Sequence, residues 1–289
     1  MDKKRPVVVL MYDFDKTLCD RDMQEYSFIP SLGLTPAEFW GKANEVAVSC
    51  NMERILSYMY VMMAEAKAKG IKLTREYLNS CAKGMKFYKG VDTWFSRINK
   101  FGEALGVKVE HYVLSSGTTE IIEGSPIAKE FKKIYGCAFH YDENGVVDFP
   151  LNTVNYTTKT QYIYRISKGV FDITNDIDLN AKTDPKQRHA SFKNMIYIGD
   201  GLTDVPCMKM VAERGGKAIA LYQKGKINNA SDLLLDGRAD FLTQADYSEG
   251  SELESVVKQN IERISLEADL DKKFKQMYEK AKKAKEANK

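Results

Sequence analysis

The sequence predicts an α/β protein with a doubly wound, mainly parallel sheet and an inserted α-helical cap. Short apolar runs of strand length alternate with segments of helical periodicity over most of the chain, a pattern typical of parallel sheets. Two of these runs, far apart in sequence, end in paired aspartates, Asp13 with Asp15 and Asp200 with Asp204. Residues 19–90 interrupt the alternation with helical patterns and no convincing strand, which predicts an insertion.

Five apolar, β-branched runs are predicted to be strands buried in the sheet. They cover residues 7–12, 109–114, 194–198, 217–221 and, with a weaker pattern, 239–242. A hairpin is predicted for residues 137–149, because Asn144-Gly145 is a strong turn signal between two apolar runs. Ligands of doubly wound sheets bind outside the carboxyl ends of the strands, where both aspartate pairs are predicted to lie.

Helix starts and apolar stripes complete the predicted elements. In the insertion, helices are predicted to begin at Thr35-Pro36, near residue 51 and at Thr74. Residues 171–192 are polar and are predicted to form an irregular insertion. Apolar residues at helical spacing predict three further helices. The first two stripes are Ile127, Phe131, Ile134 and Tyr135, and Tyr162, Ile163 and Ile166. The third is one continuous C-terminal stripe of Leu253, Val257, Ile261 and Ile264, continued by Leu266, Leu270, Phe274 and Met277.

These elements predict three units: a core from residues 1–18 and 91–245, a helical cap at 19–90, and a helical extension at 246–289. The end of the helical extension is basic and is predicted to be solvated; it contains Lys280, Lys282, Lys283, Lys285 and Lys289.

Composition and charge narrow the classes of function. The 289 residues carry 43 basic and 40 acidic side chains, a net charge of +3 that gives no case for nucleic acid as a partner. The five cysteines are scattered without a CxxC pair, as expected for reduced thiols. No signal peptide and no apolar run near the roughly 20 residues that span a membrane is evident. We therefore expect a cytoplasmic protein without a membrane partner; the oligomeric state stays open.

The two aspartate pairs predict a cation site. If they converge, Asp13, Asp15, Asp200 and Asp204 carry four negative charges in one pocket. Charges about 4 Å apart in such surroundings interact by several kcal/mol, so a site without a cation is strained or partly protonated. A hard cation with oxygen ligands relieves this repulsion, and Mg²⁺ is the expected ion.

The order of motifs resembles the signature of the haloacid dehalogenase (HAD) superfamily of phosphohydrolases. Asp13-Phe14-Asp15-Lys16-Thr17 is followed by Leu114-Ser115-Ser116-Gly117, then by Lys159, then by Gly199-Asp200-Gly201-Leu202-Thr203-Asp204. The helical insertion after the first motif looks like the cap of the phosphoserine-phosphatase-like branch. The resemblance covers roughly residues 7–245. The first and last motifs are specific, whereas the second and third gain weight from their order.

The resemblance implies a catalytic role for both aspartates of the first motif. Asp13 would be the nucleophile that forms an aspartyl-phosphate. Asp15 would protonate the leaving alcohol and then activate water. Mg²⁺ would be held by Asp13, Asp15 and Asp200.

Other motif residues would support this chemistry. By the same resemblance, Ser116, Gly117 and Lys159 would bind the phosphoryl group, and Lys159 would offset the carboxylate charge. Asp204, in the first turn of the next helix, and Thr17 would support the site.

Substrate residues are less clearly marked. Asp22 stands nine residues after Asp13, where phosphoserine phosphatases carry a glutamate that handles the substrate amine. Arg54 or Arg21 is a candidate for a substrate carboxylate. Thr118 follows Gly117, where the serine phosphatases usually carry a second glycine, so the substrate stays open.

We therefore expect a Mg²⁺-dependent phosphatase acting on a small phosphorylated metabolite. Two alternatives remain. One is a phosphotransferase or phosphomutase, in which a sugar hydroxyl intercepts the aspartyl-phosphate. The other is a catalytically inactive, phosphate-binding regulator. A dinucleotide-binding dehydrogenase is disfavoured because no G-x-G-x-x-G follows the first strand.

Overall fold

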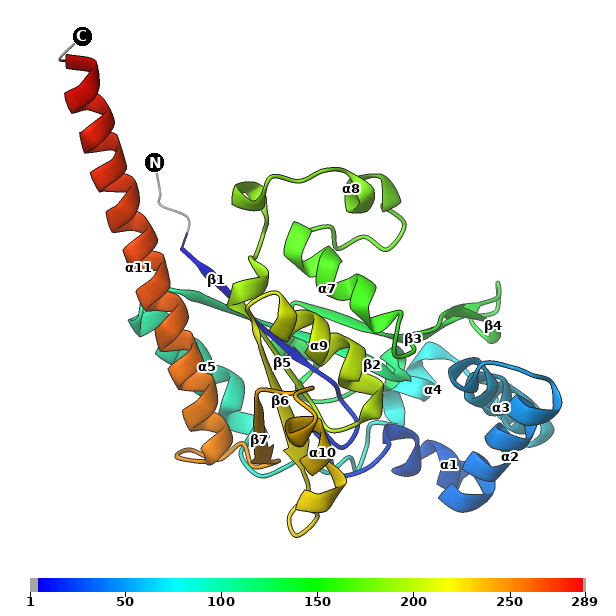
Figure 1. The fold of residues 1–289 in the computed structure, drawn as a ribbon. Helices are drawn as coiled ribbons and strands as arrows, with labels where there is room; N and C mark the ends of the chain where they lie inside the picture. The colour runs from blue at the N-terminus through cyan, green and yellow to red at the C-terminus, as the bar shows by residue number, and fades with distance from the viewer. Residues whose placement is uncertain (1–4, 288–289) are drawn as a thin grey trace.

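The computed structural model describes residues 5–287 and contains a seven-stranded sheet with helices on both faces (Figure 1). The strand order is β4-β3-β2-β1-β5-β6-β7, and only the β3–β4 pair is antiparallel. The strands are β1 (Val7–Tyr12), β2 (Lys108–Thr118), β3 (Lys133–Tyr141), β4 (Val147–Asn152), β5 (Met195–Gly199), β6 (Lys217–Tyr222) and β7 (Phe241–Gln244). The predicted doubly wound, mainly parallel fold is confirmed.

Strand β1 is the central strand and lies at the point where the strand order reverses. It pairs with β2 on one side and with β5 on the other. All six of its residues are buried, as the apolar run predicts. Because the chain moves away from β1 and β5 in opposite directions across the sheet, the segments that follow these two strands diverge and leave room for a ligand.

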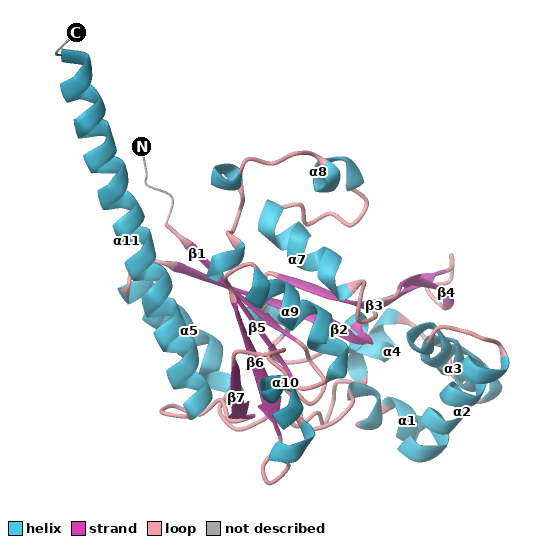
Figure 2. Cartoon of the chain, viewed as in Figure 1, coloured by secondary structure: helices cyan, strands magenta, loops and turns pink. Residues whose placement is uncertain are grey.

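The helices form two layers around the sheet and a separate group beyond its edge (Figure 2). Helices α7 and α9 cover one face, and α5 and α11 lie on the other. The helices are α1 (Phe28–Ser31), α2 (Pro36–Ser49), α3 (Arg54–Ala68), α4 (Arg75–Ser80), α5 (Val91–Ala104), α6 (Thr119–Glu123), α7 (Lys159–Lys168), α8 (Asp176–Asn180), α9 (Val205–Glu213), α10 (Ser231–Leu235) and α11 (Glu252–Ala287).

Helices α1 to α4 follow β1 directly and lie together beyond its carboxyl end (Figure 1). The predicted helix starts are confirmed by their caps. Thr35 and Glu38 form a capping box with Pro36 in the first turn of α2, and Thr74 caps α4. These caps satisfy backbone N–H groups that have no partner within the helix. An antiparallel bridge between Cys19 and Phe87 holds the two ends of this segment together.

The helix predicted around residues 127–135 is wrong. Residues 128–130 form one short 3₁₀ turn, and β3 begins at Lys133. Tyr135, Cys137 and Phe139 alternate toward the interior, which is strand periodicity that a short apolar run does not distinguish from a helical one. The predicted hairpin that follows is confirmed, with Gly145 at φ 72° in the turn between β3 and β4.

Residues 171–192 are irregular, as predicted, but they include the short helix α8. The buried side chain of Arg165, on α7, donates hydrogen bonds to the carbonyls of Asp172 and Ile173 and so holds the start of the segment. Near its end, His189 pairs with Glu110 close to the start of β2. The segment therefore packs at the end of the sheet opposite the carboxyl ends of the strands.

The predicted continuous stripe of the C-terminal helix is also wrong. In α11, Leu253, Val257, Ile261 and Ile264 are buried against the core. The apolar residues from Leu266 onward are exposed, on a length of helix that projects beyond the sheet (Figure 1). Among residues 5–287, no helix combines the length and the apolar character needed to cross a membrane.

Candidate active site

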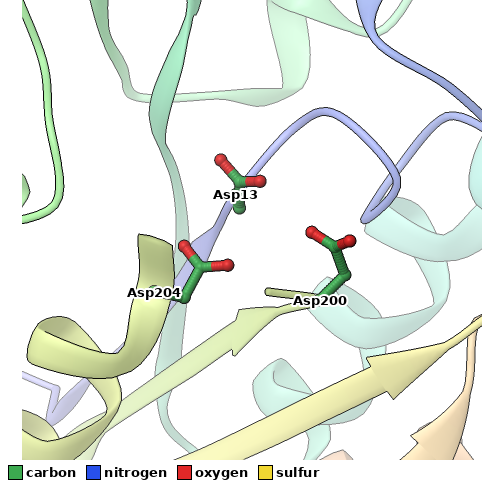
Figure 3. Close-up of side chains that lie close together, drawn as sticks. All are labelled: Asp13, Asp200 and Asp204. Atoms are coloured by element: carbon green, nitrogen blue, oxygen red, sulfur yellow. The ribbon is translucent and has the colours of Figure 1, made fainter. Parts of the chain in front are cut away.

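Three aspartates meet where β1 and β5 end (Figure 3). Asp13, Asp200 and Asp204 each offer a carboxylate oxygen within 4.8 Å of the other two. The backbone N–H of Asp13 donates to the carbonyl of Ile198 at 2.9 Å, so the residue after β1 is bonded to the carboxyl end of strand β5. The structure thus brings together acidic residues that are nearly 200 positions apart in sequence.

Within this cluster, Asp204 is held in place by hydrogen bonds and close packing. The sequence predicted Asp204 in the first turn of the helix that follows. In the structure it ends a 3₁₀ turn, Leu202–Asp204, and lies immediately before α9. Its fully buried carboxylate accepts hydrogen bonds from the Tyr197 hydroxyl at 2.7 Å and from the Gly201 N–H at 3.3 Å. A Cβ on Gly199 would stand 2.5 Å from this carboxylate, so only glycine fits there.

Lys159 supplies the positive charge of the site. It begins α7, and its side chain is completely buried. The ammonium group donates to Asp13 at 2.9 Å and to Asp204 at 2.8 Å. Burial alone would lower the pKa of Lys159, but these two carboxylates outweigh it and raise the pKa, so the ammonium stays charged.

One lysine does not neutralise three aspartates, and the pKa values of Asp13 and Asp200 are raised. Burial, offset in part by Lys159, raises the pKa of Asp13 to about 6. Burial and then the charges of Asp13 and Asp204 raise the pKa of Asp200 well above its usual range. The negative charge left over, on oxygen ligands alone, fits a hard divalent cation such as Mg²⁺.

Asp15 is separated from this cluster and faces a different environment. Phe14 between them points into the core, where its ring meets that of Phe87 edge-on. The Asp15 carboxylate accepts the N–H of Met23 at 2.8 Å. Burial, followed by the charges of Asp22 and Asp13, raises the pKa of Asp15 well above its usual range. Like Asp200, Asp15 therefore favours its protonated form, but it lies beside the second motif and forms no ion pair with Lys159 in the described part of the chain.

The second motif lies beside Asp15. Ser116 and Gly117 belong to the last residues of β2, where the pairing with β3 shifts register. The Ser116 hydroxyl is buried and has no hydrogen-bond partner among the described residues. A Cβ on Gly117 would stand 2.0 Å from the Met23 Cε and 3.0 Å from an Asp15 oxygen. Glycine therefore lets the strand approach the acid, and Ser116 keeps a free hydroxyl for a ligand.

The remaining predicted residues lie in varied places. Thr17 is buried in the turn after β1, and its hydroxyl has no partner within residues 5–287. Asp22 forms an ion pair with Lys16 at 2.8 Å rather than standing free for a substrate amine. Arg54 is exposed and donates to Asn44 on α2, and Arg21 is paired with Asp20. The two arginines thus have partners on the surface.

Sequence reasoning gave no role to three side chains that shape the site. Tyr58, on α3, donates to the Ser116 carbonyl at 2.7 Å and so links the helical insertion to the second motif. Tyr197, on β5, donates a hydrogen bond to Asp204. Lys16 has a left-handed backbone φ of 56° and forms an ion pair with Asp22. Lys16 could have been considered from the sequence, because it lies inside the first motif. No sequence pattern marks Tyr58, because its contact with Ser116 forms only when distant segments fold together.

Comparisons with known proteins agree with this architecture. No family model matches the chain. An uncharacterized protein of Borreliella burgdorferi is 26% identical over 290 residues, covering 90% of this chain and 99% of the relative. A HAD family hydrolase from Salmonella enterica serovar Typhi superposes with a TM-score of 0.54 at 16% identity, over 82% of this chain and 67% of its own. A structure of a phospho-aspartyl intermediate analogue of phosphoserine phosphatase superposes with a TM-score of 0.52 at 14% identity, over 89% of this chain and 99% of its own.

The chain therefore has the fold of HAD family hydrolases. Within that class its fold is similar to that of the phosphoserine phosphatases, which confirms the resemblance in fold predicted from the motifs. At these identities the likeness is one of fold, so the chemistry has to be argued from the residues themselves.

Proposed function

We propose that this protein is a Mg²⁺-dependent phosphatase that hydrolyses a small phosphorylated metabolite through an aspartyl-phosphate on Asp13. The observation that carries the proposal is the pairing of two unlike carboxyl groups on one turn. Asp13 lies against Lys159, whereas Asp15 lies in surroundings that favour its protonated form. Groups whose surroundings separate their pKa values can serve as nucleophile and general acid in one reaction.

The proposed chemistry assigns each residue a step. An ionised Asp13 oxygen attacks phosphorus, while Asp15 donates its proton to the leaving oxygen. Asp15, now ionised, then removes a proton from the water that hydrolyses the aspartyl-phosphate. Lys159 and the unpaired hydroxyl of Ser116 bind the phosphoryl oxygens, where negative charge has to be stabilised.

A Mg²⁺ ion would be held by Asp13 and Asp200 together with the Asp15 backbone carbonyl, with Asp204 and Thr17 in support. Bound there, the ion supplies positive charge that lets a phosphate dianion approach a carboxylate. The carboxylate oxygens that lie within 4.8 Å of one another support this assignment.

The helical segment at residues 19–90 would act as a cap that selects the substrate, beside a core of 1–18 and 91–245 and an extension of 246–289. The contact of Tyr58 with Ser116 supports a cap that reaches the phosphate-binding strand. Asp22 would act on the substrate through its ion pair with Lys16. The five free cysteines support a reducing, cytoplasmic location.

The decisive experiment measures phosphate release from a panel of phosphorylated metabolites and from an aryl phosphate, with Mg²⁺ and with a chelator. We expect turnover only with Mg²⁺, and loss of turnover in the Asp13→Asn variant. Asp148→Asn, which changes an exposed aspartate on β4, is the matched control and should retain full activity. Turnover by the Asp13→Asn variant at the wild-type rate would refute the nucleophile.

The same assay separates the two alternatives. An isomeric sugar phosphate formed from a hexose phosphate, without free phosphate, would identify a phosphomutase. No release from any substrate under either condition would favour a phosphate-binding regulator.

A further inference from the structure

The distal part of α11 presents an apolar face that its own chain leaves uncovered. Leu266, Leu270, Phe274 and Met277 are 63%, 54%, 67% and 70% exposed. They recur at intervals of three and four residues along one side of the helix. Isolated helices are marginal in water, and most helical stability in proteins comes from packing an apolar face. A face of this size on a projecting helix therefore calls for a partner.

This face is distinct from the one that α11 packs on the core. At roughly 100° per residue, the exposed stripe lies about 140° around the helix axis from the stripe of Leu253, Val257, Ile261 and Ile264. The end of α11 projects beyond the sheet (Figure 1), and past Ile264 only polar contacts with the core are found among residues 5–287: Ser265 with the Leu105 carbonyl, and Glu267 and Asp271 with Lys193. A second helix can therefore pack on the exposed stripe without displacing the core contacts.

Charge along the projecting segment is unevenly distributed. Residues 266–271 carry Glu267, Asp269 and Asp271 and no base, whereas residues 272–287 carry seven lysines against two glutamates. Two such segments aligned in parallel would place the basic ends side by side. Aligned antiparallel, each acidic part lies against the basic part of the other copy, so the segment is complementary to itself.

We propose that the projecting part of α11 is a dimerisation element, and that its occupant is the same segment of a second copy of this chain, packed antiparallel. With Phe274 opposite Met277 of the second copy, Leu270 faces Ala281 and Leu266 faces the aliphatic stem of Lys285. In this register Ile264 faces Ala287, so the overlap uses the described length that projects and stops where core packing begins. The interface is two-fold symmetric, as in most dimers of identical chains.

This interface is independent of the proposed phosphatase chemistry. Its residues lie on α11 beyond the core, whereas the aspartates stand at the carboxyl ends of β1 and β5 (Figures 1 and 3). Failure of one proposal therefore leaves the other standing.

The first test measures the mass of the full chain by sedimentation over a range of concentrations. We expect the wild type to approach twice the monomer mass and the Leu270→Gln/Phe274→Gln variant to remain monomeric. Lys272→Gln/Glu279→Gln is the matched control, because these residues lie on the opposite side of the helix and the net charge is unchanged. A wild type that stays monomeric at all concentrations, or a control that dissociates as fully as the stripe variant, would overturn the proposal.

The second test exchanges charges. Asp269→Lys/Asp271→Lys and Lys280→Glu/Lys282→Glu should each weaken self-association at least tenfold, because like charges then meet across the two-fold axis. Asp271 also touches Lys193 in its own chain, but only at 3.5 Å and on the surface. Mixing the two variants should restore a dimer that contains one copy of each; failure to restore it would refute the antiparallel arrangement.

A third arm tests a lipid surface as the competing occupant. Wild-type protein is mixed with vesicles of phosphatidylcholine alone and with added phosphatidylserine. Monomeric protein that binds only the anionic vesicles, and loses this binding in the Leu270→Gln/Phe274→Gln variant, would assign the face to a membrane and overturn the dimer.

Discussion

Replacing Asp13 with Asn should abolish activity and yet stabilise the metal-free protein. The Asp13 carboxylate lies within 4.8 Å of two other carboxylates, and at an effective dielectric constant of about 20 each repulsion amounts to about 3.5 kcal/mol. The attraction to Lys159 at 2.9 Å is about 6 kcal/mol on the same scale. Repulsion and attraction therefore nearly cancel, and the main effect of the variant is to avoid the burial of a charge, which raises the pKa of Asp13 to about 6. We expect the free energy of unfolding to rise by about 1–3 kcal/mol.

The assay is denaturant unfolding of both proteins at pH 7.5, with a chelator and with Mg²⁺. Mg²⁺ should stabilise the wild type more than the variant, because a ligand that binds only the folded state adds to its stability and the variant has lost a ligand atom. Asp148→Asn serves as the control and should shift stability by well under 1 kcal/mol, as expected of an exposed ion pair. A metal-free Asp13→Asn variant that is less stable than the wild type would refute this electrostatic account.

Three further outcomes follow from individual contacts. Lys159→Met keeps the length of the side chain but removes its charge, and should lower kcat/KM by at least about 100-fold; a smaller loss would exclude a role in phosphate binding. Gly117→Ala should lower kcat, because its Cβ would displace the end of the Met23 side chain and crowd the Asp15 carboxylate at 3.0 Å; unchanged kinetics would contradict the close approach. Burial lowers the pKa of His111 to about 3, so the folded protein excludes a proton that the unfolded chain binds below about pH 6.5. Wild-type stability should therefore fall by up to about 1.4 kcal/mol per pH unit below pH 6.5 from this group, and His111→Gln should remove that slope in unfolding measured from pH 7 to 4.5; equal slopes would show that His111 is not the group responsible.

Much of the core was predictable because its signals are local. Strand β1 is a run of buried apolar residues whose limits were predicted from the sequence. The N-cap residues Thr35 and Thr74 indicate the starts of their helices within three or four residues. The first part of β3, before the predicted hairpin, was missed because Tyr135 lies in a run whose spacing suits a helix equally well. What decided the outcome was pairing with β2, a contact between distant segments that a local pattern does not contain.

The site divides in the same way. Asp13 and Asp200 could be proposed because acidic pairs at the ends of buried strands are unusual. Lys159 could be proposed only from its place in the order of motifs, because a lysine at the start of a helix is ordinarily solvated. The ion pair of Asp22 with Lys16 and the surface pairing of Arg54 could not be foreseen, since both depend on turns within the helical segment. Substrate residues are therefore the part that sequence reasoning reaches last, because they are set by how that segment packs over the sheet.

The position of the insertion gives this dependence a physical basis. Helices α1 to α4 leave the sheet directly after Asp15, whose carboxylate is bonded to the N–H of Met23 at the start of that segment. The same segment returns to the second motif through Tyr58. A displacement of these helices would therefore loosen both the bond that positions Asp15 and the bond that fixes the Ser116 carbonyl. The positions of Asp15 and of the Ser116 carbonyl on β2 therefore depend on the packing of the helical segment against the sheet.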